Sequence, residues 1–211
     1  TARVMARAMT YDFLVLGGGI AGTSAGARLS QLGSVLLLEA EEALAYHASG
    51  RSAALYEASY GHPVTVALNR ASRAEHESLD GGVLSPRGLR LLGGPGEEAA
   101  AEADIANMGL APLAPDEAAA RVPIVQRAHV TRAGWHDDAL DIDTDRMVQV
   151  FARTIRAASG EVRTRAPVEA IARDGAVRRV TAHGETCEAR VLVNAAGAWA
   201  DRVAQMAGIA P

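Results

Sequence analysis

The segment 11–39 constrains the fold of this chain more than any other part of the sequence. Its first residues, 11–16, are an apolar run of strand-forming side chains, and the glycine pattern Gly17-x-Gly19-x-x-Gly22 follows directly. An alanine-rich segment, 21–32, then leads to a second apolar run that ends in Glu39. A strand, a glycine turn, a helix and a second strand ending in an acidic residue are the pattern of a dinucleotide-binding βαβ unit.

Each part of this pattern has a physical role. Gly17 permits the tight turn out of the strand, Gly19 lets the backbone approach a pyrophosphate, and Gly22 lets the helix pack close to the sheet. The first turn of the helix offers unpaired N–H groups and a positive dipole to the phosphates. Glu39 stands where a carboxylate can accept both hydroxyls of an adenosine ribose, and this acidic residue disfavours the 2′-phosphate of NADP. The alternative, a glycine-rich turn in another α/β protein, is disfavoured by the complete context of the motif.

Length and composition indicate a globular protein. The chain has 211 residues, enough for one large domain or two small ones. All 21 basic residues are arginine, which excludes a lysine Schiff base and a P-loop lysine. The net charge of −4 gives no argument for nucleic acid as a partner. No apolar run approaches the ~20 residues of a membrane span, and the segment 1–9 has the pattern of neither a signal peptide nor an anchor.

Cysteine usage predicts a reducing compartment. Cys187 is the only cysteine, so the chain contains no internal disulfide, and we expect a cytoplasmic protein. The neighbours of Cys187 are typical of an exposed sheet, and we expect no catalytic role for it. We expect Trp135 and Trp199 in the core rather than stacked on a cofactor.

The rest of the chain alternates between helical and strand-like patterns. Helices are predicted over 63–79, 97–108, 115–121, 146–159 and 200–207. Strands are predicted over 84–92 (two strands and a turn), over 130–135, and in the apolar run that opens segment 191–199. The segments 161–164, 167–171, 177–182 and 186–189 predict a small antiparallel sheet.

No metal site is predicted. The aspartates of segment 141–145 superficially resemble a calcium loop, but its sixth position is Arg146 instead of glycine and its twelfth is Ala152 instead of glutamate. We interpret Asp143, Thr144 or Asp145 as the N-cap of the following helix. The histidines other than His47 lack the spacing of metal ligands, and we expect them on the surface.

Two further blocks carry a resemblance to a known family. Residues 46–54 read Tyr-His-Ala-Ser-Gly-Arg-Ser-Ala-Ala, and residues 191–199 read Val-Leu-Val-Asn-Ala-Ala-Gly-Ala-Trp. Together with the segment 12–39, they make the chain resemble FAD-dependent oxidoreductases of the D-amino-acid oxidase superfamily, which includes glycine and sarcosine oxidases. Within it, the chain is most similar to bacterial D-arginine dehydrogenase-like enzymes. The likeness extends from about residue 11 to the end.

The resemblance implies FAD as the cofactor and assigns residues to it. Gly17, Gly19, Ala21 and Gly22 would hold the pyrophosphate, Glu39 the adenosine ribose, and Val168 the adenine through its backbone. Other implied cofactor-binding residues are Ala40, Gly50, Arg51, Ser52, Ala53, Ala54, Ala195, Ala196 and Gly197.

The resemblance also implies an α/β fold. A Rossmann-like FAD-binding domain of the glutathione-reductase type would comprise 10–59 and 141–211, with an inserted, incomplete α+β substrate domain at 60–140. Family members run well beyond this length, so we interpret the chain as an N-terminal fragment that lacks the family's C-terminal half. We therefore expect the chain alone to bind FAD weakly or not at all and to be inactive.

The implied reaction is oxidation of a D-amino acid or related amine at its α-carbon by hydride transfer to flavin N5, giving an imino acid that hydrolyses to a 2-oxo acid. Oxygen or a quinone-linked carrier would accept the electrons. Tyr60 would face the substrate, although a buried tyrosine without this role is an equal alternative. Leu55 stands where the D-arginine dehydrogenase-like enzymes have a histidine, which leaves the substrate open. We expect His47 to pack near the cofactor loop without covalent attachment to the flavin.

Two other functions remain open at this stage. The first is an FAD-dependent oxidoreductase of a 2-hydroxy acid or glycerol phosphate on the same scaffold. The second is a non-catalytic nucleotide-binding module. An NAD-only dehydrogenase is a weaker alternative, because the block 46–54 has no obvious role there.

Overall fold

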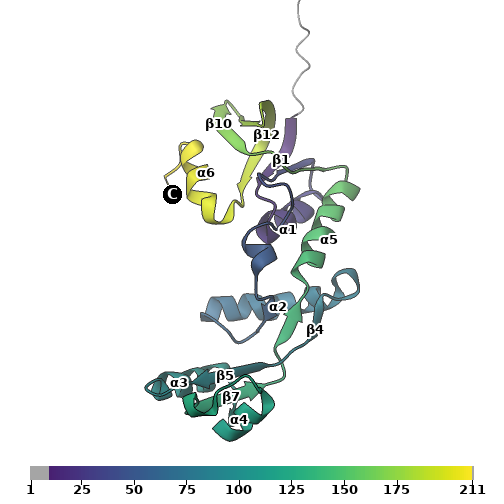
Figure 1. Ribbon diagram of the computed structural model, residues 1–211. Coiled ribbons are helices and arrows are strands. Elements are labelled where there is room, and N and C mark those ends of the chain that lie inside the picture. Colours follow the sequence, from purple (N-terminus) through teal and green to yellow (C-terminus); the bar gives the residue numbers. More distant parts are fainter. Residues whose placement is uncertain (1–9, 211) are drawn as a thin grey trace, which may run out of the picture. The chain divides into compact units, whose positions relative to one another are not determined.

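The computed structural model describes residues 10–210, which form two compact units (Figure 1). Unit 1 is discontinuous and comprises the described residues up to Ser52 together with those from Thr144 onward, whereas unit 2 is the continuous segment Ala53–Asp143. An inserted second unit was expected from the sequence. The assignment of unit 1 to the cofactor and of unit 2 to the substrate stays a prediction.

Unit 1 is built on a six-stranded sheet with the order β10-β11-β12-β1-β2-β9. Its strands are β1 (Thr10–Leu16), β2 (Val35–Leu38), β9 (Glu161–Arg163), β10 (Val168–Asp174), β11 (Val177–Ala182) and β12 (Glu185–Asn194). The strands β12, β1, β2 and β9 run parallel, and β10 and β11 join antiparallel at one edge. The predicted α/β fold class is confirmed.

Strands β1 and β2 are neighbours in the interior of the sheet, where their apolar runs are buried on both faces. All of β2 is buried, and Leu14 and Leu36 pair across the two strands with no exposed surface. Continuous apolar runs of this kind are typical of parallel strands covered on both sides. The carboxyl ends of β1, β2 and β12 therefore meet at one edge of the sheet, where the glycine pattern begins.

The pairing of two strands differs from the sequence-based prediction. Strand β12 is one continuous strand of ten residues, not two separate ones. Its first half pairs antiparallel with β11 and its second half parallel with β1, so the small antiparallel sheet is an extension of the main sheet. Strand β9 is not part of the antiparallel group but pairs parallel with β2. These pairings join residues far apart in the sequence, which local patterns do not report.

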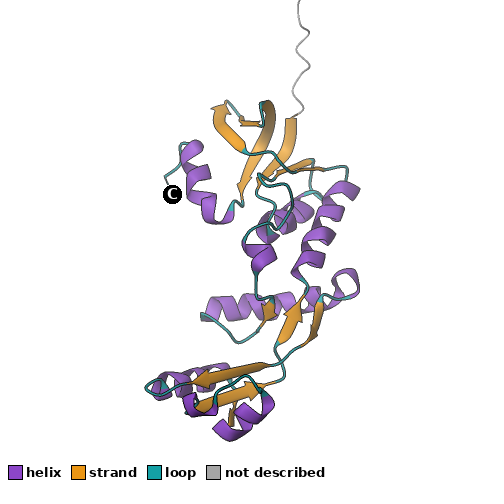
Figure 2. Cartoon of the chain, viewed as in Figure 1, coloured by secondary structure: helices purple, strands orange, loops and turns teal. Residues whose placement is uncertain are grey.

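Two helices, α1 (Ile20–Leu29) and α5 (Thr144–Ala157), pack against each other in unit 1 (Figure 2). A Cβ on Gly26 would stand 2.7 Å from the side chain of the fully buried Ile155, so glycine allows this close approach. The observed bounds differ slightly from the predicted ones. The helix predicted over 21–32 ends at Leu29, and the helix predicted over 146–159 begins at Thr144. The short helix α6 (Ala200–Met206) follows β12 through a 3₁₀ turn at Gly197–Trp199.

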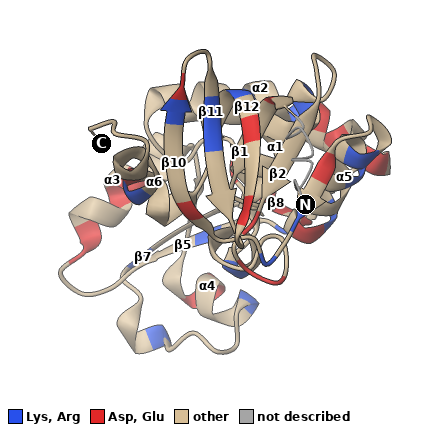
Figure 3. Ribbon diagram, turned by 90° about the horizontal axis from the view of Figure 1, so that it is seen from above, with Lys and Arg blue, Asp and Glu red and all other residues tan. Residues whose placement is uncertain are grey.

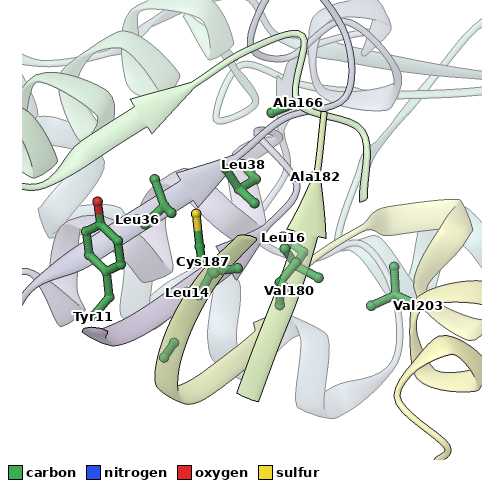
Figure 4. Close-up of a cluster of buried hydrophobic side chains, with 11 residues drawn as sticks. Tyr11, Leu14, Leu16, Leu36, Leu38, Ala166, Val180, Ala182, Cys187 and Val203 are labelled. Atoms are coloured by element: carbon green, nitrogen blue, oxygen red, sulfur yellow. The ribbon is translucent and has the colours of Figure 1, made fainter. Parts of the chain in front are cut away.

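The other face of the sheet carries a core that includes Cys187 (Figure 4). The expectation of an exposed Cys187 is wrong, because its side chain points into this cluster beside Leu14 and Leu36 and is only 8% exposed. Burial raises the pKa of its thiol. Glu188 and Arg190 point to the opposite side of the strand, where acidic and basic positions lie on adjacent strands (Figure 3) and Arg179 pairs with Glu188. Glu185 lies on the same face as Cys187, and both contact Arg163.

Unit 2 contains two small sheets with the orders β3-β8-β4 and β5-β7-β6. Their strands are β3 (Leu55–Tyr56), β4 (Leu84–Pro86), β5 (Leu89–Gly93), β6 (Ala111–Leu113), β7 (Arg132–His136) and β8 (Leu140–Ile142). The helices of the unit are α2 (Pro63–Ser78), α3 (Glu98–Met108) and α4 (Pro115–Arg121). All three helices were predicted, whereas the short strands β3, β6 and β8 were not.

Helix α2 is the least buried of the long helices. None of its sixteen described residues is classed as buried. Tyr60, Val64 and Leu68 are spaced four residues apart and are 68%, 64% and 63% exposed, respectively. Val64 and Leu68 share one face of α2, and Tyr60 lies in the segment before the helix, so this part of unit 2 exposes large apolar side chains to solvent. Within the described residues, no helix is long and apolar enough to cross a membrane.

Candidate dinucleotide site

A pocket of about 500 Å³ lies in unit 1 at the carboxyl ends of the parallel strands. Its volume is in the range of small-molecule sites. Residues from β1, β2 and β12 and from the loops that follow them form its walls, and α6 contributes a further side. The lining residues are Leu16, Gly17, Gly19, Leu38, Glu39, Ala40, Glu41, Ala45, Tyr46, His47, Ala48, Ser49, Ala166, Pro167, Val168, Ala195, Ala196, Gly197, Ala198, Trp199, Arg202, Val203 and Met206.

The glycine loop is packed so tightly that two of its positions require glycine. A Cβ on Gly22 would lie 1.9 Å from the carbonyl oxygen of Gly17, and one on Gly17 would lie 2.3 Å from that of Ala195. Gly17 also has a φ of +112°, which favours glycine. At Gly19 a Cβ would stand 3.2 Å from the hydroxyl of Ser49, a milder restriction. The loop thus has the close backbone approach that the motif predicts.

Glu39 fixes the shape of this loop. Its carboxylate accepts the Gly18 N–H through Oε2 at 2.6 Å and the Glu41 N–H through Oε1 at 2.8 Å. A Cβ on Gly18 would lie 2.9 Å from Oε2, so the approach of Glu39 also needs glycine there, a requirement that the sequence analysis did not include. A carboxylate has about four acceptor sites, so both oxygens retain capacity for ligand hydroxyls.

Ser49 occupies the start of helix α1. Gly19, the N-cap, has no side chain to accept a helix N–H, and the Ile20 N–H instead donates to Ser49 Oγ at 3.0 Å. Because the hydroxyl oxygen accepts this bond, its own proton is left to donate to an anion at the helix N-terminus. Ser49 lies within the block 46–54 but was not among the predicted site residues.

An aromatic cluster forms one rim of the pocket. The ring of His47 packs on Trp199 with centroids 4.6 Å apart, and its Nε2 lies 2.8 Å from Glu41 Oε1. Tyr46 meets His47 edge to face at 5.1 Å, and Arg51 lies over the Tyr46 ring at 5.2 Å. The expectation that Trp199 is a core residue is wrong, because it lines the pocket and is 46% exposed.

The predicted site residues separate into three groups. Those that line the pocket are Gly17, Gly19, Glu39, Ala40, Val168, Ala195, Ala196 and Gly197. Those that belong to unit 1 outside the lining are Ala21, Gly22, Gly50, Arg51 and Ser52. Those that belong to unit 2 are Ala53, Ala54 and Tyr60. The residues of α6 that line the pocket, Arg202, Val203 and Met206, were missed because a short helix of mixed composition carries no ligand-binding signal of its own.

A largely buried Glu57–His136 contact lies in unit 2. Glu57 is 7% exposed, its Oε2 lies 2.8 Å from His136 Nε2, and its Oε1 accepts the Ser59 N–H at 2.8 Å. The Tyr60 N–H donates to the Glu57 carbonyl at 3.4 Å. The expectation of surface histidines is therefore wrong for His136, whose side chain is 16% exposed. Glu57 was missed because a single glutamate, of a residue type that is mostly exposed, gives no sign of burial in the sequence.

Tyr11, whose pKa departs strongly from its ordinary value, lies at the opposite end of β1 from the pocket. Burial, reinforced by its 2.5 Å hydrogen bond to Glu161, raises the pKa of Tyr11 to about 12. The same hydrogen bond lowers the pKa of Glu161. This pair ties β1 to the edge strand β9, so its role is structural. Among the described residues, no group of three or more His, Cys, Asp or Glu side chains is arranged to hold a metal ion.

The sequence profile of a known family matches nearly the whole chain. The match covers residues 12–211, and the family is described as FAD dependent oxidoreductase, abbreviated DAO. The chain belongs to this family. FAD is the cofactor of DAO proteins, and the glycine loop, Glu39 and Ser49 offer the donors and acceptors that the pyrophosphate and ribose of such a dinucleotide need.

Solved structures of DAO-like proteins share the fold. Glycine oxidase from Geobacillus kaustophilus superimposes with a TM-score of 0.78 at 24% identity, covering 93% of this chain and 58% of that protein. L-α-glycerophosphate oxidase from Mycoplasma pneumoniae, solved with FAD bound, gives a TM-score of 0.80 at 18% identity, covering 95% of this chain and 57% of that protein. L-proline dehydrogenase from P. horikoshii gives a TM-score of 0.78 at 19% identity, covering 96% of this chain and 57% of that protein. The chain thus spans a little over half the length of these proteins.

Proposed function

We propose that this chain carries the cofactor-binding part of an FAD-dependent oxidoreductase that oxidises the α-carbon C–N bond of an amino acid or related amine. The observation that carries the proposal is the pocket of unit 1, in which the glycine loop, Glu39 and Val168 meet at one edge of a parallel sheet. Ligands of open α/β folds bind at this edge. Family membership supports FAD as the dinucleotide.

The pocket residues have distinct parts in holding the cofactor. Glu39 accepts the ribose hydroxyls, and the Gly19 N–H and the Ser49 hydroxyl donate to the pyrophosphate. The N–H groups of Gly17 and Gly18 are bound to the Leu38 carbonyl and to Glu39 and shape the loop instead. Backbone groups of Val168 contact the adenine. Bound FAD supplies the hydride acceptor of the reaction. The protein orients the cofactor and the substrate, and Tyr60 of unit 2 positions the amine or carboxylate of the substrate.

The finer assignments follow from the sequence resemblance. We propose a D-amino acid as substrate, an imino acid that hydrolyses to a 2-oxo acid as product, and a cytoplasmic protein of bacterial type. Oxygen or a quinone-linked carrier accepts the electrons. The structural similarity to glycine oxidase supports an amine substrate in general terms.

A second candidate function is oxidation of a 2-hydroxy acid or glycerol phosphate. The high TM-score of the glycerophosphate oxidase supports it. The two functions are separable in the full-length protein by an anaerobic screen of substrates that follows loss of the oxidised flavin absorbance. Bleaching by amino acids or amines supports the first function. Bleaching by hydroxy acids or glycerol phosphate alone would replace it with the second.

The proposal that the pocket of unit 1 binds the ADP half of FAD is testable on the purified chain with ADP as the ligand. We expect Glu39→Gln to weaken ADP binding about tenfold, the loss of about 1.4 kcal/mol. The loss should shrink with 2′-deoxy-ADP, which lacks one of the hydroxyls that Glu39 accepts. Calorimetric titration of both ligands provides the measurement.

Glu42→Gln is the matched control. Glu42 lies in the same loop, does not line the pocket, and forms an exposed ion pair with Arg165. We expect this variant to bind ADP like the unchanged chain. If Glu39→Gln weakens ADP and 2′-deoxy-ADP equally, Glu39 acts only by shaping the loop and its assignment to the ribose is lost.

A further inference from the structure

The contact between His47 and Trp199 joins two loops that come from different strands. His47 belongs to the segment after β2, and Trp199 belongs to the turn after β12. These strands pair with β1 on opposite sides. The contacting rings, tilted by 50° to one another, therefore connect the two walls of the pocket that flank the carboxyl end of β1, and both residues line the pocket.

Glu41 holds His47 in this position. Its Oε1 lies 2.8 Å from Nε2 of the imidazole, and its backbone N–H is bound to the Glu39 carboxylate at 2.8 Å. A continuous series of contacts thus runs from Glu39, the residue proposed to bind the ribose, to Trp199. We define Glu41, His47 and Trp199 as the rim bridge.

The rim bridge lies at the mouth of the pocket and not in its interior. The side chains of Glu41 and His47 are each 38% exposed, and Trp199 is 46% exposed. A half-exposed hydrogen bond and a single ring contact are individually weak interactions in water. The bridge can therefore break and re-form without unfolding of the sheet beneath it.

We infer that the rim bridge controls the exchange of the nucleotide, with His47 as the positioning residue that closes the pocket mouth. This inference rests on the proposed nucleotide pocket and adds to it residues that act on the rate of exchange. A bridge that must open for entry and for exit slows both steps. A residue that contacts the nucleotide directly slows only its exit.

The test follows ADP binding to the 211-residue chain by stopped-flow fluorescence of Trp199. Trp135→Phe, made in every variant, leaves Trp199 as the only tryptophan. We expect His47→Ala to raise the association and dissociation rate constants of ADP by about fivefold to tenfold each, with the dissociation constant changed less than threefold. His47→Gln, which retains an amide for Glu41 without an aromatic ring, should give an intermediate increase. His183→Asn, at an exposed turn outside the pocket lining, should leave both rates unchanged.

Three results would overturn the inference, and they differ from one another. Faster dissociation with unchanged association would identify His47 as a direct nucleotide contact. Unchanged rates would show that the bridge does not limit exchange. A chain that binds no ADP even without the His47 substitution would remove the nucleotide pocket itself, and the inference with it. As a measurement without ligand, His47→Ala should brighten Trp199 by removing the imidazole in contact with its ring, and an unchanged emission would contradict the contact.

Discussion

The two units of the chain differ in what holds them together. Among the described residues, the largest fully buried side chains all belong to unit 1: Leu14, Leu16, Leu36, Leu37, Ile155, Val15, Val35, Val148, Val180 and Thr23. The fully or almost fully buried residues of unit 2 include the small Ala118, Ala133 and Ala139. Unit 2 instead exposes large apolar side chains along α2.

This difference has a consequence for stability and for binding. Burial of large apolar side chains stabilises a fold by about 1.5–3 kcal/mol each, so the parallel sheet of unit 1 has strong local support. Its pocket is formed by loops anchored directly to that sheet, as a cofactor site requires. Unit 2 has less buried apolar surface to oppose local opening, and we expect its elements to open at lower free energy.

The largest expected effect comes from a pair of glycine substitutions, one in each unit. Gly22→Ala should destabilise unit 1 by more than about 4 kcal/mol, because its new methyl group would lie 1.9 Å from the Gly17 carbonyl oxygen. This oxygen belongs to the backbone of the glycine loop, which cannot move aside as a side chain can. Gly134→Ala should cost unit 2 less, about 1–3 kcal/mol, because its nearest neighbours are side-chain atoms, Ile105 Cγ1 at 2.7 Å and Leu110 Cβ at 3.1 Å, which yield more easily than a backbone carbonyl.

Chemical denaturation followed by circular dichroism measures both glycine variants. ADP binding is a second readout, which Gly22→Ala should abolish and Gly134→Ala should leave intact. Equal losses of stability in the two variants would contradict the difference in packing between the units.

A second pair compares the same substitution in the two cores. Ile155→Ala should destabilise unit 1 by about 3–4 kcal/mol, because Ile155 is fully buried between Gly26 and Gly160. Ile105→Ala should cost unit 2 about 2 kcal/mol, because Ile105 is 9% exposed and lines an open groove beside Leu110.

The thiol of Cys187 reports which unit has opened. It is the only cysteine of the chain and is buried in unit 1, where burial raises its pKa, so it reacts slowly with a thiol reagent until the sheet opens. We expect Ile155→Ala to accelerate labelling of Cys187 strongly and Ile105→Ala to leave it unchanged. Acceleration by both variants would show that the units open together.

Sequence reasoning was strongest where local pattern determines structure. The segment 11–39 predicted the βαβ unit because apolar strands and a glycine turn can be predicted from local sequence without long-range contacts. The helices of unit 2 were predicted for the same reason. Gly109 ends α3 with a φ of +67°, as expected of a glycine that terminates a helix.

It failed where partners are distant. Strand β9 pairs with β2, and Cys187 is buried beside Leu14 and Leu36; in both cases the partners are more than a hundred residues away in the sequence. His136 is buried against Glu57, nearly eighty residues away. Trp199 was expected in the core because tryptophan is more often a core residue than one stacked on a cofactor, whereas its ring meets His47, which follows a different strand. Local periodicity contains no record of such contacts.

The smallest expected effect is the loss of stability of unit 2 at acidic pH. Burial lowers the pKa of His76 on α2 below its ordinary value, against a smaller opposing effect of Glu75. The unfolded chain therefore binds a proton at a higher pH than the folded one does, so the free energy of unfolding of unit 2 falls as the pH drops from about 6.5 through the pKa of the folded state. Hydrogen exchange of α2 amides, corrected for the intrinsic rate, should be less protected at pH 5.5 than at pH 7.5. His76→Phe, which keeps a ring beside Tyr56, should reduce this dependence, and amides of β1 should not show it. An unaltered pH dependence in His76→Phe would assign the acid sensitivity of unit 2 to another group.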